Sequence, residues 1–465
     1  MLFLRGFAFA ALSTFALAAA PAFAADKPAS AAPSGLSLAE ALGVAYETNP
    51  QLGAAQAGVR ATDESVALAN SNWRPKISAT GTYGFEKFNY SGSPGWFGTH
   101  PLNAQLGVSE EIFRGGRTYA EIGKAKADVR AARAQLLAAE QTVLLGAATA
   151  YMDVVRDTAI LNLRRQNVEV LRKQRDMTAL EFKAGSLTRT DVAQSEARLA
   201  AAQTDLVTAE GQLAISRSNF EQVVGRPAET LEANPALPAA VPGNENDALA
   251  LALKQNPALV SAQENERAAS YAVDDAVGAL LPEVTVQGAY NYSQQSYNST
   301  IGAGSVVHGL DVLAQVNVPI YQGGAEEATV RQAKELHAQA SLNVSTADLQ
   351  VRNAIAAAWN TFQAAQAGIA SNQATAKADE IAFMGVRKEQ QVGGRTILDV
   401  LNAQQELLNA QVAVVTSQRN ATVAAFQLLA AAGNLTAKSL ALKVRLYDPL
   451  AHYESDAARW VGFGD

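Results

Sequence analysis

The chain has no cysteine among its 465 residues, and this one absence excludes several kinds of site. Without thiols the chain cannot form a disulfide, a thiolate metal site or a cysteine nucleophile. It also cannot carry a lipid on an N-terminal cysteine. Any attachment to a membrane must therefore come from the fold itself.

Strong charge is also missing. Only 17% of the residues are charged and the formal net charge is −7, a mild value that argues against a nucleic-acid partner. Serine, histidine and acidic residues do not share the spacing of a nucleophilic site, and no glycine-rich phosphate loop follows a predicted strand. We therefore predict neither an enzyme nor a bound cofactor.

Histidines, the commonest metal ligands, are scarce. His100 and His308 lie 208 residues apart, at matching positions of two predicted loops. If several copies of the chain form a ring, these histidines could together hold a metal. A chance loop position is the better interpretation, and we expect no metal site. The four histidines are His100, His308, His337 and His452.

Long apolar runs are confined to the N-terminus. Residues 1–24 combine a charged start at Arg5, an apolar stretch and the small-x-small sequence Ala22-Phe23-Ala24, which is typical of a signal peptide. The alternative, a membrane anchor, needs ~20 apolar residues, more than this stretch offers. We expect the mature chain to leave the cytoplasm without a helical anchor.

What the sequence does contain is a strict seven-residue apolar period, present twice. It runs over residues 192–220 after Gly185 and over residues 400–428 after Gly393, with small side chains at the second seam position. This pattern predicts tightly packed coiled-coil helices. The two copies predict an internally duplicated chain.

Ahead of each long helical segment the period changes from helical to two. Residues 77–85 and 284–292 alternate apolar and polar side chains, and a second alternating run follows each one after a Gly/Ser/Asn-rich loop, at 102–108 and 312–320. Four strands in two hairpins are therefore predicted. Each is close to the ~9–11 residues of a tilted strand that crosses a bilayer.

Alternation alone does not distinguish membrane strands from the half-buried strands of a soluble sheet. Aromatic residues lie in and beside these runs, as they do in the interfacial girdles of outer-membrane barrels, and the signal peptide supplies the compartment. We therefore predict that the strands cross a membrane. The aromatic residues are Tyr83, Phe85, Phe88, Tyr90, Trp96, Phe97, Tyr290, Tyr292 and Tyr297.

The patterns divide the chain into two repeats. Each contains an Asn-Pro helix start, a strand hairpin with a Gly-Gly exit, and a helix roughly 100 Å long whose chain turns back at Gly185 or Gly393. We expect a first repeat at 25–225, with a strand hairpin at 76–113 and a helical hairpin at 117–225. A linker at 226–246 follows, and then a second repeat at 247–435, with a strand hairpin at 283–321 and a helical hairpin at 325–432. The tail at 436–465 is expected at the waist of the molecule.

A sheet of four strands cannot stand alone in lipid. Its two edges would leave N–H and C=O groups unpaired, at several kcal/mol each. Two chains would form a barrel filled by its own side chains, whereas three would give twelve strands around an open lumen. The unpaired edges therefore require a closed ring of at least two chains, and we predict three.

These features together resemble the TolC family of outer-membrane channel-tunnels, the ducts of type I secretion and multidrug efflux. The resemblance covers nearly all of the mature chain and is carried most specifically by residues 392–401, VGGRTILDVL, which are close to the family's second hairpin tip. It implies a mostly α fold with a membrane β-barrel: a homotrimer in outer-membrane lipid, with a twelve-stranded barrel on a twelve-helix periplasmic tunnel. The implied partners are a periplasmic adaptor protein and an inner-membrane pump, either an ABC or a proton-driven transporter.

The resemblance also assigns residues to the periplasmic gate. Arg395 and Asp191 match positions that link neighbouring helix pairs, and their opposite charges could act as a latch. The alternative for Asp191 and Asp399 is a charge that favours a helix N-terminus. Asp399 matches an acidic ring of the constriction, but the second ring position is Asn402, which puts strong divalent-cation binding in doubt. A tyrosine of the family's latch falls on Gln390, so that link is expected to differ.

The hairpin tips are the expected docking site for the adaptor. Gly185, Ser186, Gly393 and Gly394 match the family's docking turns, although tight turns that need φ > 0 explain the glycines as well. Two other functions explain less of the sequence: a pore-less periplasmic coiled-coil scaffold leaves the strands unexplained, and a passive porin leaves the long helices without a role. The predicted function is an export duct gated at its helix tips, whose cargo the pump selects.

Overall fold

The computed structural model describes residues 35–465 except 90, 93–94, 239, 298–304, 457–458 and 463–465. The predicted signal peptide at 1–24 and Tyr90 of the aromatic set lie outside the described residues. The elements are α1 (Leu38–Thr48), α2 (Pro50–Asn70), η1 (Ser71–Trp73), β1 (Lys76–Tyr83), β2 (Glu86–Phe88), β3 (Phe97–Arg114), α3 (Arg117–Lys183), α4 (Arg189–Val224), α5 (Glu245–Gln255), α6 (Pro257–Gly278), β4 (Glu283–Tyr297), β5 (Ser305–Asn317), α7 (Ala325–Gln391), α8 (Ile397–Ala431) and α9 (Ala451–Asp456).

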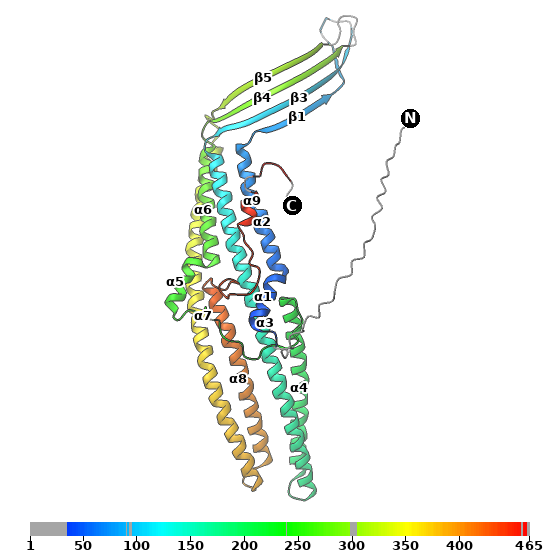
Figure 1. Cartoon of the computed structure of the whole chain (residues 1–465), viewed down its shortest axis with the longest axis vertical. Helices are drawn as coiled ribbons and strands as arrows, with labels where there is room; N and C mark the ends of the chain where they lie inside the picture. The colour runs from blue at the N-terminus through cyan, green and yellow to red at the C-terminus, as the bar shows by residue number, and fades with distance from the viewer. Residues whose placement is uncertain are drawn as a thin grey trace, which may run out of the picture.

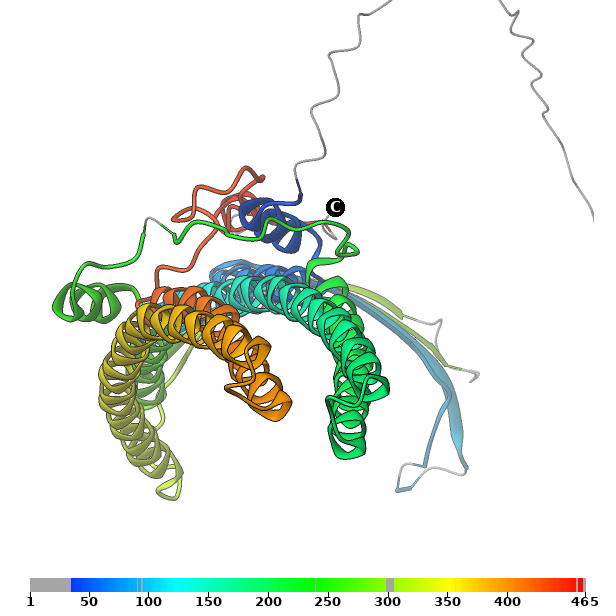
Figure 2. The same ribbon diagram turned by 90° about the horizontal axis from the view of Figure 1, so that it is seen from below.

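The molecule is a long rod with a sheet at one end and two helix tips at the other (Figure 1). The helices form one curved layer, and α1, the linker between the repeats and the C-terminal tail lie on its convex side (Figure 2). The order of elements repeats, and α3 and α7 are both 67 residues long. The chain is thus mostly helical with a small antiparallel sheet, as predicted.

Each repeat begins a helix at its Asn-Pro pair. The Asn49 Oδ1 accepts a hydrogen bond from the Gln51 N–H at 2.9 Å, and Pro50 occupies the first helical turn, where a missing N–H costs nothing. In the second repeat the Asn256 Oδ1 accepts from the Ala258 N–H at 3.0 Å. The Asn49 and Asn256 side chains also donate to carbonyls at the ends of α4 and α8, so each cap joins the lead-in helices to the returning helix.

The sheet has the order β1-β3-β4-β5, and all of its pairs are antiparallel. The β3–β4 pair joins the two hairpins, with Leu106 opposite Tyr290. The single strand predicted at 77–85 ends at Tyr83 as β1, and the short strand β2 begins at Glu86, because the ladder breaks opposite Pro101. The Gly84 N–H donates to the Pro101 carbonyl at 3.0 Å, but proline has no N–H to return the bond.

The strands reach further into the outer loops than the alternating side chains indicated. His100 lies in β3 and His308 in β5, which corrects their placement in loops. Backbone pairing does not depend on side-chain alternation, so Gly-, Ser- and Asn-rich ends continue the ladder. Within the described residues, no cluster of three or more His, Asp or Glu side chains could hold a metal.

The two faces of the sheet differ in chemistry. Cross-strand partners point to the same face, so the register sorts the side chains. The apolar face carries Ile77, Ala79, Tyr83, Leu102, Ala104, Leu106, Val108, Val284, Val286, Tyr290, Tyr292, Val306, His308, Leu310, Val312, Ala314 and Val316, together with the polar Glu110 and Gln294. The other face carries Ser78, Thr80, Thr82, Asn103, Gln105, Ser109, Thr285, Gln287, Asn291, Ser293, Asp311, Gln315 and Asn317, together with Val307 and Leu313.

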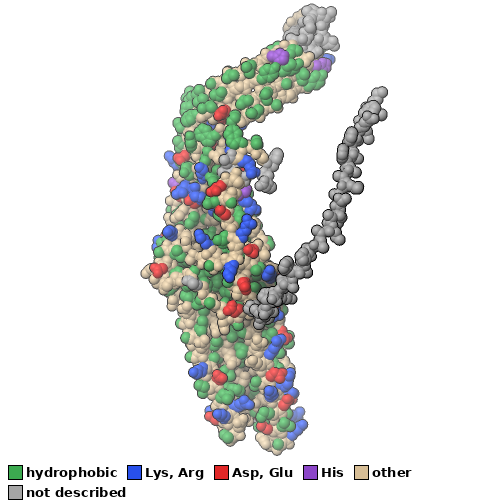
Figure 3. All heavy atoms as spheres, viewed as in Figure 1, with side chains coloured by type: hydrophobic (Ala, Val, Ile, Leu, Met, Phe, Trp, Pro, Cys, Tyr) green, Lys and Arg blue, Asp and Glu red, His purple; other side chains and the backbone are tan. Residues whose placement is uncertain are grey.

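In the surface view, apolar side chains dominate the sheet while charged ones gather on the helices below it (Figure 3). Many side chains of the apolar face are exposed, with Leu310 at 77% and Val312 at 74%. Among the described residues, no helix combines the length and the apolar character that crossing a membrane requires.

The largest apolar core lies at the waist, where α1, α3, α4 and the linker meet. Tyr151 and Phe220 are completely buried there. The Tyr151 hydroxyl donates to the carbonyls of Leu36 and Glu232 at 2.8 and 3.1 Å, so α3 holds both the first described segment and the linker.

Candidate functional site at the helix tips and the waist

The two helix tips are built in the same way. Gly185 (φ +80°) and Gly393 (φ +82°) turn the chain in the left-handed region, and open space surrounds the position of a Cβ at each. The Ser186 N–H donates to the Glu181 carbonyl and the Gly394 N–H to the Glu389 carbonyl. Both turns therefore need glycine for its backbone conformation, since nothing crowds the site.

A capping box starts the returning helix at each tip. At α4 the Asp191 N–H donates to the Thr188 Oγ1 at 3.3 Å, and the Asp191 carboxylate accepts from the Thr188 N–H at 2.9 Å. Thr396 and Asp399 repeat this arrangement at α8. The hydrogen bonds from Thr188 and from Thr396 lower the pKa of Asp191 and of Asp399. The interpretation of both aspartates as helix-start charges thus has a direct structural basis.

The residues of the predicted latch do not contact each other within this chain. The Arg395 Nε lies 2.9 Å from the Glu389 Oε2 at its own tip, and both side chains are about half exposed. This pairing raises the pKa of Arg395. The Asp191 carboxylate accepts hydrogen bonds from Thr188 in the capping box of the other hairpin. A link between Arg395 and Asp191 therefore stays a prediction about contacts between copies.

Asn402 makes a contact that sequence reasoning missed. Its Oδ1 accepts a hydrogen bond from the Arg198 Nη2 at 2.9 Å, which joins α8 to α4 across the two hairpins. One signal could have found Arg198: it lies two helical turns beyond Asp191 on the same face of its helix. Next to Asn402, Leu401 packs into a small apolar cluster with Leu171 and Leu199.

A polar seam joins the hairpins at the waist. The Arg419 Nε of α8 lies 2.9 Å from the Asp153 Oδ1 of α3, and the Arg156 Nε lies 2.7 Å from the buried Asp157. The Ser216 hydroxyl of α4 donates to Asp157 at 2.5 Å. The seam therefore connects α3 with both returning helices, and the sequence patterns did not reveal it.

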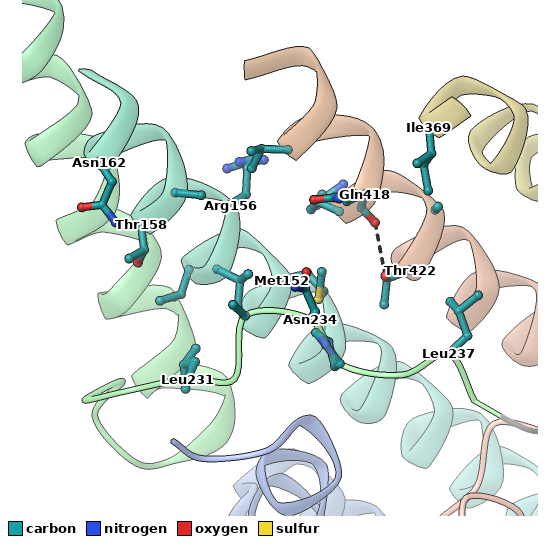
Figure 4. Close-up of a pocket in the computed structure, with 18 of the residues that line it drawn as sticks. Met152, Arg156, Thr158, Asn162, Leu231, Asn234, Leu237, Ile369, Gln418 and Thr422 are labelled. Carbon is teal, nitrogen blue, oxygen red and sulfur yellow. Dashed lines mark hydrogen bonds between the residues drawn. The ribbon is translucent and has the colours of Figure 1, made fainter. Parts of the chain in front are cut away.

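Beside this seam lies a cavity of about 690 Å³ between the linker and helices α3, α7 and α8. Figure 4 shows Met152 and Arg156 of α3, Leu231 and Asn234 of the linker, and Thr422 of α8 around it. The hydrogen bond drawn there runs from the Thr422 hydroxyl to the Gln418 carbonyl. The linker thus covers the seam without filling the space above it.

The architecture defines a class of protein. The chain shares its fold with the open-state MtrE outer membrane channel of Neisseria gonorrhoeae at a TM-score of 0.72 and 20% identity, covering 86% of this chain and 89% of that one. A rod of long helices that carries a two-faced sheet is thus the fold of an outer-membrane channel.

The chain belongs to the outer membrane efflux protein family, whose model matches residues 41–226 and 248–434. It is 35% identical over 426 residues to outer membrane efflux protein BepC of Brucella suis, covering 91% of each chain. It is 26% identical over 437 residues to outer membrane protein TolC of Escherichia coli, covering 90% of this chain and 87% of that one. The predicted membership of the TolC family is confirmed. The protein is an export duct of the outer membrane.

Proposed function

We propose that three copies of this chain close into a twelve-stranded barrel continued by a twelve-helix tunnel, and that the helix tips form its gate. In this proposal a periplasmic adaptor docks at the tips and an inner-membrane transporter, ABC-type or proton-driven, supplies the cargo. The observation that carries it is the pair of unpaired sheet edges. Among the described residues, β1 pairs only with β3, and β5 only with β4.

Closure satisfies these edges. The apolar face, which includes Leu106 and Leu310, would face the hydrocarbon of the bilayer. Each unpaired backbone group of a sheet edge costs several kcal/mol there. Pairing β1 of one copy with β5 of the next removes both edges at once. Two copies would make a barrel filled by side chains, whereas three leave a lumen lined by the polar face.

Helix α7 supports the same closure. Leu342 and Leu349 are 69% and 67% exposed, and because they are one heptad apart they lie on the same side of the helix. Val207 and Ile215 of α4, on the opposite edge of the helical layer, are also largely exposed. These two apolar edges would cover each other between neighbouring copies.

The gate consists of weak links at the tips. In the closed ring, Arg395 would exchange Glu389 for Asp191 of a neighbouring copy, and Asp399 and Asn402 would line the entrance. Asn402 is neutral and is engaged by Arg198, so we expect weak binding of divalent cations. Exposed ion pairs are individually weak, and a ring of them can be released by a partner that binds the turns. Gly185, Ser186, Gly393 and Gly394 present these turns.

Single-channel conductance tests the gate. The purified protein in planar bilayers should conduct poorly, and Arg395→Ala or Asp191→Ala should raise its conductance because the ring of links is lost. Arg352→Ala is the matched control, since it removes an exposed ion pair of α7 far from the tips. Unchanged conductance in both tip variants would reject the latch. High conductance before any substitution would favour a passive porin.

A further inference from the structure

Residues 459–462 of the C-terminal tail lie at the base of the sheet rather than at the waist. The tail was expected at the waist, and its first part does pack there, where the Tyr447 N–H donates to the Tyr46 hydroxyl. Beyond this point α9 packs along α2 and leads the chain toward the sheet (Figure 1). The Arg74 Nη1 then donates to the Arg459 carbonyl at 2.7 Å.

Two large apolar side chains of this segment are left in the open. Trp460 is 69% exposed and Val461 is 88% exposed. The Arg74 guanidinium lies 4.9 Å from the centre of the Trp460 ring, so one arginine holds both the backbone and the aromatic ring of the segment. A tryptophan held in one place yet left uncovered needs a partner surface.

The position of Arg74 identifies that surface. Arg74 is two residues before the first residue of β1, and Ile77, the first side chain of the apolar face, is 71% exposed. Trp73 packs edge-on against Tyr119 with ring centres 4.9 Å apart, and Tyr119 is 70% exposed. An exposed aromatic cluster at the boundary of an apolar sheet face is the pattern of a membrane–water interface, where Trp and Tyr rings settle.

We propose that residues 459–462 form a C-terminal anchor that lies in the phospholipid headgroup region of the periplasmic leaflet, with Trp460 as its contact residue. Trp460 rests its ring against the lipid interface while Arg74 holds it from the protein side. On the apolar face the register places Glu110 one position below the pair of Ile77 and Val108, and this carboxylate marks where the hydrocarbon region ends. The anchor rests on the proposed function in one respect, because it requires the sheet to cross the bilayer.

The tail is attached below the anchor as well. The Arg133 guanidinium lies over the Tyr453 ring with 5.1 Å to its centre, and His452 lies beside the buried Asp63, with 3.5 Å between Nδ1 and Oδ2. Asp63 precedes Arg74 by about three turns of helix, roughly 16 Å. The tail thus spans the region between the helical body and the membrane surface along α2.

Depth-dependent fluorescence quenching tests the anchor. The full-length protein carries Trp73, Trp96, Trp359 and Trp460, so replacing the first three with phenylalanine leaves Trp460 as the single reporter. The variant is reconstituted into phosphatidylcholine vesicles whose acyl chains carry bromine either near the headgroup or near the methyl end. Trp460 should lose more emission to the shallow label than to the deep one. Arg74→Ala should abolish this loss, while Arg74→Lys should largely keep it.

Two controls separate this inference from the proposed function. In the first control, the chain's own four tryptophans are replaced with phenylalanine and Leu310→Trp is added. The emission of this single tryptophan reports whether the apolar face enters the bilayer, and the deep label should quench it strongly. Trp359 alone should not be quenched, since it lies roughly 50 Å down α7 from the base of the sheet. If the single-tryptophan chains do not assemble, the difference between the unmodified protein and Trp460→Phe provides the same measurement.

The outcomes are distinct. Quenching at Leu310→Trp without quenching of Trp460 would overturn the anchor while the duct stands. In that case blue-shifted Trp460 emission would show that a neighbouring copy covers the ring. Loss of quenching at both positions would overturn the bilayer-spanning sheet together with the anchor.

Discussion

Helices α3 and α7 have equal length and matching positions in the two repeats, yet the structure treats them differently. Of their 67 residues each, α3 buries 23 and α7 buries 3, all of them among the described residues. Leu144 of α3 is completely buried, whereas the matching residue of α7 is Arg352, which pairs with Asp348 on the surface. Duplication has therefore preserved the heptad period while the two helices took different neighbours.

The difference shows that α3 forms part of the core of a single copy, whereas α7 lies at its surface. Helix α3 has α2, α4, α6 and α8 packed around it, so its apolar residues belong to the core of a single copy. Helix α7 lies at the edge of the curved layer (Figure 2). Several of its leucines are exposed. Substitutions at the buried residues of α3 should therefore damage folding, and substitutions at the exposed leucines of α7 should damage assembly.

The largest effect is expected from charges on the exposed side of α7. Leu342→Asp combined with Leu349→Asp should abolish the proposed trimer, because carboxylates would face the apolar edge of the next copy. Heat-modifiable migration of a detergent extract on a gel measures this. Gln339→Asp adds a charge to the same helix without removing apolar surface and should leave the trimer intact. A normal trimer from the double variant would show that this side of α7 faces solvent.

An intermediate effect is expected from the core of α3. Leu144→Ala should destabilise the chain by about 2–5 kcal/mol, because it leaves a cavity among the buried residues of the waist. Arg352→Ala at the matching position of α7 should change the free energy of unfolding little. Urea unfolding followed by circular dichroism compares the two variants. Equal losses would mean that α3 and α7 contribute alike to the fold.

The smallest effect is a pH dependence that only the first repeat should show. Burial raises the pKa of Tyr151 from 10.0 to about 12, because the phenolate is disfavoured at the waist. Its contribution to stability is therefore complete below pH 10, where the unfolded state also keeps the proton, and is lost as the pH rises toward 12. The matching residue in α7, Trp359, does not titrate.

Urea midpoints at a series of alkaline pH values measure this effect. Tyr151→Phe should be less stable than the unmodified protein below pH 10, since it lacks the hydrogen bonds to Leu36 and Glu232. It should also lose less stability across the alkaline range. Parallel curves for the two proteins would contradict the assignment of this titration to Tyr151.

Much of the architecture followed from local patterns. The heptads after Gly185 and Gly393 predicted the returning helices, and the long helices expected at 117–182 and 325–391 correspond to α3 and α7. Asn-Pro pairs predicted helix starts because they combine a capping side chain with a residue that lacks an N–H. These features depend on neighbours within a turn or a heptad, so a single sequence is enough to predict them.

Other features depend on contacts between distant segments, and the tertiary structure alone decided them. The sequence by itself determined the duplicated order of helices and strands and the apolar face of the sheet, because periodicity specifies which side chains share a face. Only the fold decided that Arg395 meets Glu389, that Asn402 accepts from Arg198, and that Trp460 reaches Arg74. Each of those contacts depends on how turns, hairpins and the tail are placed in space, and a period in the sequence does not record that placement.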